Sequence, residues 1–303
     1  MPLDPQISAI MEVLGADHGA QLASMDVAEA VVLIRSGPRP EPANLAYWED
    51  RLLFVDGREV PVRITRPEGD GPFPILMNFH GCGWVTGSVA GDDLRCQRLT
   101  KLAGCVTISV DYRLAPENPF PAGFEDCLGA TRWALANAAE MDGDPARVAV
   151  SGASAGANIA AAVAAQVNEI AFLLLFYPVI DATARGGDLP GGPHYLTRAA
   201  MDWYWARYLG DFADRTDPRI SPNLLPDLAL MPPALVIAAQ YDPLAAEART
   251  YCEALSAAGV PATYVEMPGT IHGFVSFAPD LPQTLEAIER GAAALRAIFG
   301  NPP

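Results

Sequence analysis

Residues 152–156 read Gly152-Ala153-Ser154-Ala155-Gly156, a serine with a glycine two positions away on either side. An apolar run at 147–150 precedes this stretch and an alanine-rich run at 157–167 follows it, which predicts a strand, a tight turn and a helix. This arrangement is typical of a nucleophile elbow, where the serine backbone is strained and the strand and helix approach closely. The turn would present the Ser154 hydroxyl above a sheet, within reach of a base and a substrate.

Strands and helices are expected to alternate on both sides of this turn. The expected strands are short apolar runs at 74–79, 106–110, 148–151, 171–177, 234–239 and 263–267. The expected helices lie near 94–103, 123–138, 155–167, 245–258 and 283–299. Strands that are apolar throughout are typical of a parallel sheet with helices on both faces. A hairpin at 51–55 and 60–66, around Asp56-Gly57, brings the total to about eight strands.

Two segments fall outside this alternation. Residues 1–45 are expected to form helices at 6–14 and 26–36 that end at a proline-rich link, 37–40. An insertion at about 182–230 contains two glycine pairs, at 186–187 and 191–192, and the aromatic run Trp203-Tyr204-Trp205. We expect both segments to pack over the carboxyl edge of the sheet as a helical cap. The catalytic domain would then comprise residues 46–303.

The charge balance limits the choice of partners. The chain has 303 residues, with 20 basic and 36 acidic side chains and a net charge of −16. Nucleic acids and anionic membrane surfaces are bound through basic patches, so neither is expected as a partner. Neutral or cationic small molecules fit this charge better, although acidic surfaces are often simply solvated.

The cysteines and the apolar runs bear on localisation. Five scattered cysteines without metal-ligand spacing are typical of a reduced protein with mostly buried thiols. The first residues show no basic region followed by an apolar stretch, so no signal peptide is expected. The longest apolar run, 170–177, is too short to span a bilayer. We therefore expect a cytoplasmic protein with no membrane anchor.

A serine nucleophile requires a base, usually histidine, and a carboxylate that orients the base. Of the four histidines, His272 lies just after the expected strand 263–267, and Asp242 follows the expected strand 234–239. Functional groups of a parallel α/β sheet gather in the loops after its strands. A loop histidine can also be purely structural, but the chain order Ser154, Asp242, His272 is that of the α/β-hydrolase fold.

Hydrolysis through a tetrahedral intermediate also requires donors for its oxyanion. The sequence His80-Gly81-Cys82-Gly83-Trp84 follows the expected strand 74–79, where an oxyanion loop belongs in this fold. Such a loop donates backbone N–H groups, so small residues are favoured. Ala155, directly after the serine, is expected to donate another.

Together these motifs resemble the hormone-sensitive-lipase-like group of α/β-hydrolases, a set of serine carboxylesterases. Four motifs carry the resemblance: His80 to Trp84 (HGGGW/F in the family), Asp111-Tyr112-Arg113-Leu114-Ala115-Pro116-Glu117, Gly152 to Gly156 (GDSAG in the family) and Ile271-His272-Gly273-Phe274. Asp242-Pro243-Leu244 also fits. The resemblance implies an α/β-hydrolase fold, with a mostly parallel eight-stranded sheet flanked by helices and a helical cap.

The resemblance also implies the roles of individual residues. Ser154 would be the nucleophile, His272 the base and Asp242 the acid that orients it. The oxyanion hole would comprise the N–H groups of Cys82, Gly83 and Ala155, with Gly81 shaping the turn. His80 would hold this loop in place. The family also implies a buried ion-pair network among Asp111, Arg113 and Glu117.

Two positions depart from the family pattern. Cys82 replaces the middle glycine of the oxyanion loop, and its N–H can donate provided that the position does not require a positive φ. The cysteine is interpreted as a tolerated small residue, although its thiol would lie beside the reacting carbonyl. Ala153 stands where the family commonly has aspartate. Neither departure removes a triad residue.

Aromatic side chains are expected around the substrate. The expected pocket residues are Trp84, Tyr195, Leu196, Trp203 and Phe274, whereas Trp205 fits core packing equally well. A roofed aromatic cleft suits small apolar esters better than long emulsified lipids.

The sequence therefore predicts a cofactor-independent and metal-free serine carboxylesterase acting on small esters with short to medium acyl groups. An amidase, an arylformamidase or a lactonase could use the same triad. A non-catalytic receptor on this fold would typically have lost a triad residue, which disfavours that alternative. The edge strand and the C-terminal helix are compatible with a homodimer.

Overall fold

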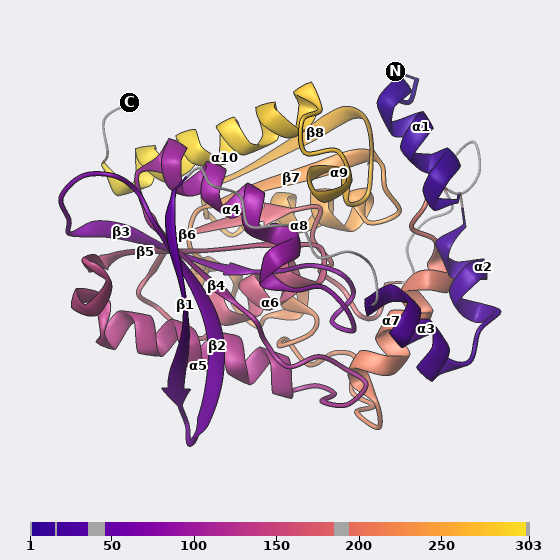
Figure 1. The fold of residues 1–303 in the computed structure, drawn as a ribbon, viewed down its shortest axis with the longest axis horizontal. Helices are drawn as coiled ribbons and strands as arrows, with labels where there is room; N and C mark the ends of the chain where they lie inside the picture. The colour runs from indigo at the N-terminus through magenta and orange to yellow at the C-terminus, as the bar shows by residue number, and fades with distance from the viewer. Residues whose placement is uncertain (1, 16, 36–45, 185–193, 301–303) are drawn as a thin grey trace.

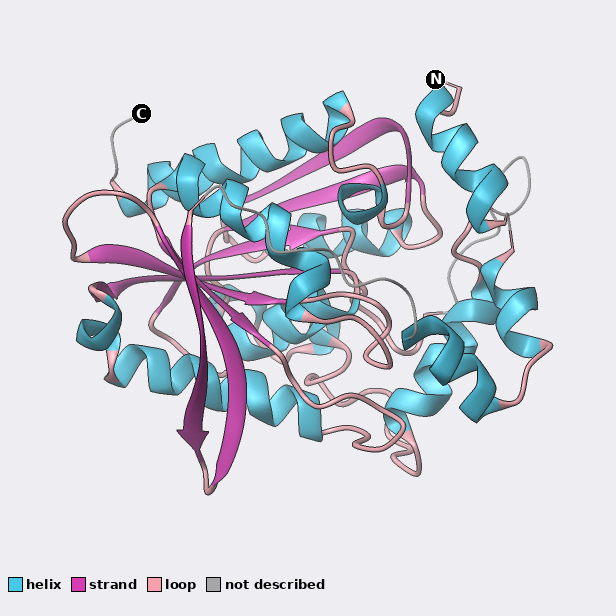
Figure 2. Ribbon diagram, in the orientation of Figure 1, coloured by secondary structure: helices cyan, strands magenta, loops and turns pink. Residues whose placement is uncertain are grey.

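The computed structural model describes residues 2–15, 17–35, 46–184 and 194–300. The proline-rich link at 37–40 and the glycine pairs at 186–187 and 191–192 lie outside the described residues. The centre of the molecule is one eight-stranded sheet with the strand order β1-β2-β4-β3-β5-β6-β7-β8 (Figures 1 and 2). The predicted α/β sheet is therefore confirmed.

Most strands of this sheet are parallel. The hairpin β1 (Tyr47–Val55) and β2 (Arg58–Arg66) is antiparallel, and β2 also pairs antiparallel with β4 (Val106–Val110). The remaining neighbours pair in parallel and add the strands β3 (Phe73–Phe79), β5 (Gly143–Ala153), β6 (Ile170–Phe176), β7 (Ala234–Tyr241) and β8 (Ala262–Ile271). In this register Phe79 lies opposite Gly152, so β3 and β5 end side by side.

Helices cover both faces of the sheet (Figure 2). The helices α4 (Val89–Ala103) and α10 (Pro282–Phe299) pack on one face, and α5 (Ala122–Ala136), α6 (Ala155–Ala164) and α8 (Ala245–Ala257) pack on the other. Successive strand side chains point to opposite faces, so Leu173 and Leu174 of β6 belong to different hydrophobic cores. Within the described ranges, no helix combines the length and hydrophobicity that a membrane span requires.

Four helices lie together at one side of the molecule, shown at the right of Figure 1. They are α1 (Pro5–Leu14), α2 (His18–Ala23), α3 (Val27–Arg35) and α7 (Arg198–Leu209). Helix α2 packs against α7, and the Thr197 hydroxyl that caps α7 donates to Asp17 at 3.3 Å. The sequence did not predict α2, because six residues are too few to show helical periodicity.

Helix α4 begins at Val89, five residues before the predicted start at 94. Its first two turns contain the charged residues Asp92, Asp93 and Arg95, of which the sequence placed Asp92 and Asp93 outside the helix. All three are at least 95% buried because Asp92 pairs with Arg95 and Asp93 pairs with Arg63 of β2. Because ion pairs allow these charged side chains to be buried, the first turns of α4 show no apolar stripe in the sequence. The hydrophobic pattern alone therefore did not reveal the start of the helix.

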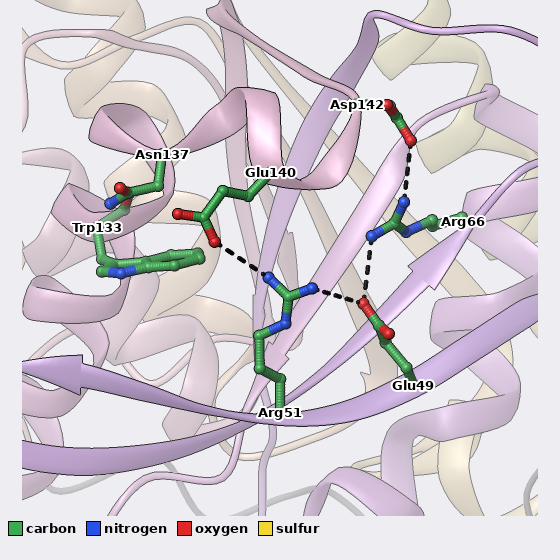
Figure 3. Close-up of polar contacts among 7 residues, drawn as sticks. All are labelled: Glu49, Arg51, Arg66, Trp133, Asn137, Glu140 and Asp142. Atoms are coloured by element: carbon green, nitrogen blue, oxygen red, sulfur yellow. Dashed lines mark hydrogen bonds and ion pairs between the residues drawn. The ribbon is translucent and has the colours of Figure 1, made fainter.

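Surface ion pairs join the β1–β2 hairpin to the rest of the sheet (Figure 3). Glu49 of β1 accepts from Arg51 at 3.0 Å and from Arg66 at 3.2 Å. Arg51 also reaches Glu140 in the 3₁₀ helix η1 (Ala138–Met141), and Arg66 reaches Asp142 just before β5. These contacts fix the hairpin beside the start of β5.

Candidate active site

The turn between β5 and α6 places Ser154 in a strained backbone conformation, with φ +55° and ψ −119°. The flanking glycines are required by close packing. A Cβ on Gly152 would lie 2.3 Å from the Gly156 carbonyl, and a Cβ on Gly156 would lie 2.0 Å from the Phe79 oxygen. The backbone N–H of Ser154 donates to the Phe176 carbonyl at 2.9 Å, which anchors the turn to β6.

Three of the expected site residues form a continuous chain of hydrogen bonds. Nε2 of His272 lies 2.8 Å from Oγ of Ser154, and Nδ1 of His272 lies 2.7 Å from Oδ2 of Asp242. Asp242 directly follows β7 and His272 directly follows β8, so neighbouring strands deliver the two groups. Asp242 is 2% exposed, and its other oxygen accepts the Leu244 N–H at 2.9 Å. These contacts favour the tautomer in which Nδ1–H donates to Asp242 and Nε2 accepts from Ser154.

Tyr177 is a site residue that sequence reasoning missed. It follows β6, and its ring packs 4.8 Å from the His272 ring and 5.7 Å from the Phe274 ring. The only sequence signal was its place at the end of an apolar strand. This packing restricts the orientation of the His272 ring.

The loop after β3 lies directly against the serine turn. A Cβ on Gly81 would lie 2.8 Å from the Ala153 oxygen and 3.5 Å from Cβ of Ser154. The chain then passes through Cys82 at φ +78° and Gly83 at φ +64°. Ala155 begins α6, where the first N–H groups of a helix are not used within it. The loop and the start of α6 thus both lie next to Ser154.

His80 is buried and its contacts are those of a structural residue. Its ring stacks on Tyr112 at 4.2 Å, and the Tyr112 hydroxyl donates to the His80 carbonyl at 2.8 Å. Nδ1 of His80 is 3.0 Å from the Gly81 oxygen. The ring therefore fixes the start of the loop.

Cys82 occupies the conformation that the sequence argument named as unfavourable for a side chain. Its φ of +78° lies in the left-handed region, so a cysteine is strained where glycine would not be. The side chain is exposed, yet the protein around it desolvates the thiolate and raises the thiol pKa to about 11. The thiol is therefore neutral at pH 7.

The expected buried network of Asp111, Arg113 and Glu117 is wrong. The Asp111 side chain is 49% exposed, and Glu117 is exposed. Arg113 instead forms a bidentate contact with Asp126 of α5, at 2.8 and 2.9 Å. Asp126 also accepts from Arg58 at 2.7 Å. The partner is distant in sequence, so the motif alone did not reveal it.

Two of the expected pocket residues have almost no surface to offer a substrate. Trp84 is 1% exposed and Phe274 is 0% exposed, so neither presents side-chain surface to solvent in this structure. Leu196 and Trp203 are also largely buried, whereas Tyr195 is partly exposed and packs on Phe277.

Tyr204 is a further residue that contacts the loop after β3, and the sequence did not predict it as part of the site. A Cβ on Gly83 would lie 2.2 Å from the Tyr204 ring, so this side chain closes directly over the loop. The ring comes from α7, far from Gly83 along the chain.

Glu247 is an acidic residue close to Asp242. It lies on α8 and accepts the Ile180 N–H at 2.8 Å. Desolvation is the main cause that raises its pKa to about 8; the nearby Asp181 and Asp242 add to this effect, and the backbone donors oppose it. In the described part of the chain, His, Cys, Asp and Glu side chains form no group of three that could hold a metal ion.

Known proteins resemble this chain over almost its whole length. A family model for the alpha/beta hydrolase fold matches residues 76–276. A carboxylesterase of Mycobacterium tuberculosis is 37% identical over 312 residues, covering 97% of this chain and 95% of the relative. An ethyl acetate hydrolase of Pseudomonas putida is 32% identical, and the match covers 98% of this chain and 99% of the relative.

A solved structure shows the same similarity in three dimensions. The hyperthermophilic esterase from Pyrobaculum calidifontis superimposes with a TM-score of 0.85 at 36% identity, covering 98% of this chain and 99% of that one. The family model, the relatives and the sheet topology agree. The chain therefore belongs to the hormone-sensitive-lipase-like carboxylesterases of the α/β-hydrolase superfamily and is a carboxylic ester hydrolase.

Proposed function

We propose that this protein hydrolyses small esters with short to medium acyl groups through a Ser154–His272–Asp242 triad. The observation that carries the proposal is the pair of hydrogen bonds from Ser154 to His272 and from His272 to Asp242. A serine hydroxyl becomes an effective nucleophile only beside such an oriented base. The strained turn at Ser154 supports the same role.

The reaction proceeds in two steps. Oγ of Ser154 attacks the ester carbonyl while Nε2 of His272 takes the hydroxyl proton, and Asp242 stabilises the imidazolium. The C–O bond to the alcohol then breaks, and the alcohol leaves with the proton from His272. In the second step His272 takes a proton from water, the hydroxide attacks the acyl carbon, and the carboxylic acid departs as Ser154 recovers its proton.

Backbone N–H groups of Cys82, Gly83 and Ala155 stabilise the oxyanion in both steps, and Gly81 shapes the turn that aims the first two. Such donors act most strongly where charge develops in the transition state. The proximity of Gly81 to Ser154 supports this assignment.

The aromatic side chains near the proposed site favour small esters as substrates. Tyr195, Leu196 and Trp203 come from the insertion, and Tyr204 closes over the loop at Gly83. We assign residues 1–45 and 182–230 to a cap that limits acyl length over a catalytic domain of residues 46–303. One relative is an ethyl acetate hydrolase, whose substrate has a short acyl group.

The first experiment is hydrolysis of p-nitrophenyl esters from acetate to dodecanoate. We expect kcat/KM to be highest for short acyl chains and kcat of Ser154→Ala to fall by roughly ten-thousandfold or more. A Ser154→Ala variant that retained near-full activity would overturn the assignment. Matched anilide and lactone substrates test amidase and lactonase activity with the same triad.

A further inference from the structure

The oxyanion loop contains three successive residues with positive φ: Cys82 at +78°, Gly83 at +64° and Trp84 at +59°. Only glycine adopts this region without cost, and for a bulky residue it is an outlier. Such a conformation persists only where the surrounding structure enforces it. The elements that contact this loop therefore determine whether its N–H groups point to the reacting carbonyl.

Hydrogen bonds to its carbonyl oxygens hold part of the backbone of this loop. The N–H and the hydroxyl of Thr86 both donate to the Cys82 oxygen, at 3.2 and 3.1 Å. The N–H of Ala115 donates to the Trp84 oxygen at 3.0 Å. Neither contact restrains the large indole ring of Trp84, whose place depends on more distant packing.

One face of α7 provides that packing. The Trp84 ring lies 4.4 Å from the Tyr208 ring, with the planes only 5° apart, and 4.3 Å from the Trp205 ring. Tyr204 lies one helical turn before Tyr208, so its ring projects from the same side of α7 and covers Gly83. Trp84 is 1% exposed, so these rings enclose it. Helix α7 begins more than a hundred residues after Trp84 along the chain.

We propose that this aromatic face of α7 positions the oxyanion loop for the reaction, with Tyr208 as its main positioning residue. The inference rests on the proposed function. Tyr208 stacks on Trp84 and would act on the loop through that ring. Its loss would let the loop relax from its positive φ angles, which moves the N–H donors away from the developing oxyanion. Because the oxyanion forms only in the transition state, kcat should fall while KM changes little.

The decisive comparison is between Tyr208→Leu and Tyr208→Phe. The leucine variant removes the stacked ring, and we expect kcat for a short p-nitrophenyl ester to fall roughly 10- to 100-fold with KM within about threefold. The phenylalanine variant keeps the ring and loses a hydroxyl that has no hydrogen-bond partner among the described residues. It should keep kcat within about threefold of the wild type.

A stability control separates positioning from general weakening of the core. Phe124 of α5 is buried in the same aromatic cluster but packs on Phe120, one contact away from Tyr208. Phe124→Leu should lower the melting temperature comparably without lowering kcat. Trp205→Leu removes the other ring beside Trp84 and should reproduce the kcat loss, so the test does not depend on one variant folding.

A second readout reports on the oxyanion directly. A trifluoromethyl ketone forms a tetrahedral adduct on the serine and places an oxyanion in the same hole. Its affinity should fall in Tyr208→Leu by the same factor as kcat/KM. The proposal is overturned if Tyr208→Leu keeps wild-type kcat, if only KM rises, or if Phe124→Leu loses kcat equally. Failure of the proposed function is recognised separately, because the wild type would then lack activity or Ser154→Ala would retain it.

Discussion

Cys82 places a thiol in the loop that packs against the serine turn at Gly81, and its surroundings determine how that thiol reacts. Its side chain is exposed, whereas the other four cysteines are buried: Cys96, Cys105, Cys127 and Cys252. Desolvation raises the pKa of the Cys82 thiol to about 11, so little thiolate is present at pH 7. The Cys82 thiol is therefore a weak nucleophile at neutral pH.

Alkylation of Cys82 should be slow at neutral pH and faster in alkaline solution. Because the thiolate is the reacting species, we expect the rate of inactivation by iodoacetamide to rise roughly tenfold per pH unit between about pH 7 and 9. In the proposed oxyanion hole the bulky adduct would block the substrate carbonyl, so we expect hydrolysis to stop. Residual p-nitrophenyl acetate activity measures the rate. Cys82→Gly is the matched control, and equal inactivation of both proteins would place the effect elsewhere.

Glu247 makes the stability of the fold depend on pH. Its pKa is about 8 in the folded protein, against about 4.3 in an unfolded chain. Between these values the folded state binds more protons than the unfolded state, so stability falls as pH rises through this window. The cause is chiefly desolvation of the carboxylate, which costs free energy only when the group is ionised.

Glu247→Gln removes this dependence. We expect the melting temperature of the wild type to fall relative to that of Glu247→Gln as the pH rises from about 5 to 8. Differential scanning calorimetry across this range measures the difference. Glu253→Gln, an exposed position on the same helix, controls for the loss of one negative charge. A melting-temperature difference that stays constant with pH would contradict the prediction.

At the scale of elements, two sets of ion pairs hold the β1–β2 hairpin. The set around Glu49 is partly exposed, with side chains 22–63% accessible, and exposed pairs contribute little. Asp126 of α5 is 2% exposed and accepts from Arg58 of β2 and from Arg113. Removing one partner of a buried pair leaves charges uncompensated. The hairpin should therefore depend more on Asp126 than on Glu49.

Urea denaturation of two alanine variants tests this ranking. Asp126→Ala should lower the free energy of unfolding by about 2 kcal/mol, because two arginines lose their carboxylate and water solvates them only in part, with side chains 26% and 40% exposed. Glu49→Ala should lower it by less than about 1 kcal/mol, and by less again in high salt. Similar losses in the two variants would show that the surface pairs of Figure 3 contribute as much as the buried carboxylate.

At the scale of the whole molecule, the net charge of −16 gives the protein an overall negative field. Such a field attracts cations over a distance that salt shortens. Neutral esters are not affected in this way. The homodimer that the sequence left open stays a prediction; β8 is the last strand of the sheet, and light scattering would measure the association.

The field should appear in the kinetics of charged substrates. We expect kcat/KM for acetylcholine to fall several-fold between about 10 and 500 mM salt, because screening removes the steering of a cation. The neutral ester 3,3-dimethylbutyl acetate has nearly the same shape and should show little change. An identical salt dependence for both esters would rule out steering by the net charge.

The sequence by itself determined the features that are encoded locally. Apolar runs marked the strands to within a few residues for most of the sheet, and β4 occupies the predicted residues 106–110. The elbow was readable because close packing at Gly152 and Gly156 excludes every larger residue. The serine, the acid and the histidine were selected by motif and chain order, and the fold then placed them within hydrogen-bond distance.

Only the tertiary structure decided which distant residues meet. It placed Tyr177 on His272, gave Arg113 its partner Asp126, and buried Trp84 under α7. These contacts depend on how helices and loops pack on the sheet, which no local pattern specifies. The same packing meets the loop at residues 82–84, whose positive φ angles are a conformation that Cys82 and Trp84 disfavour.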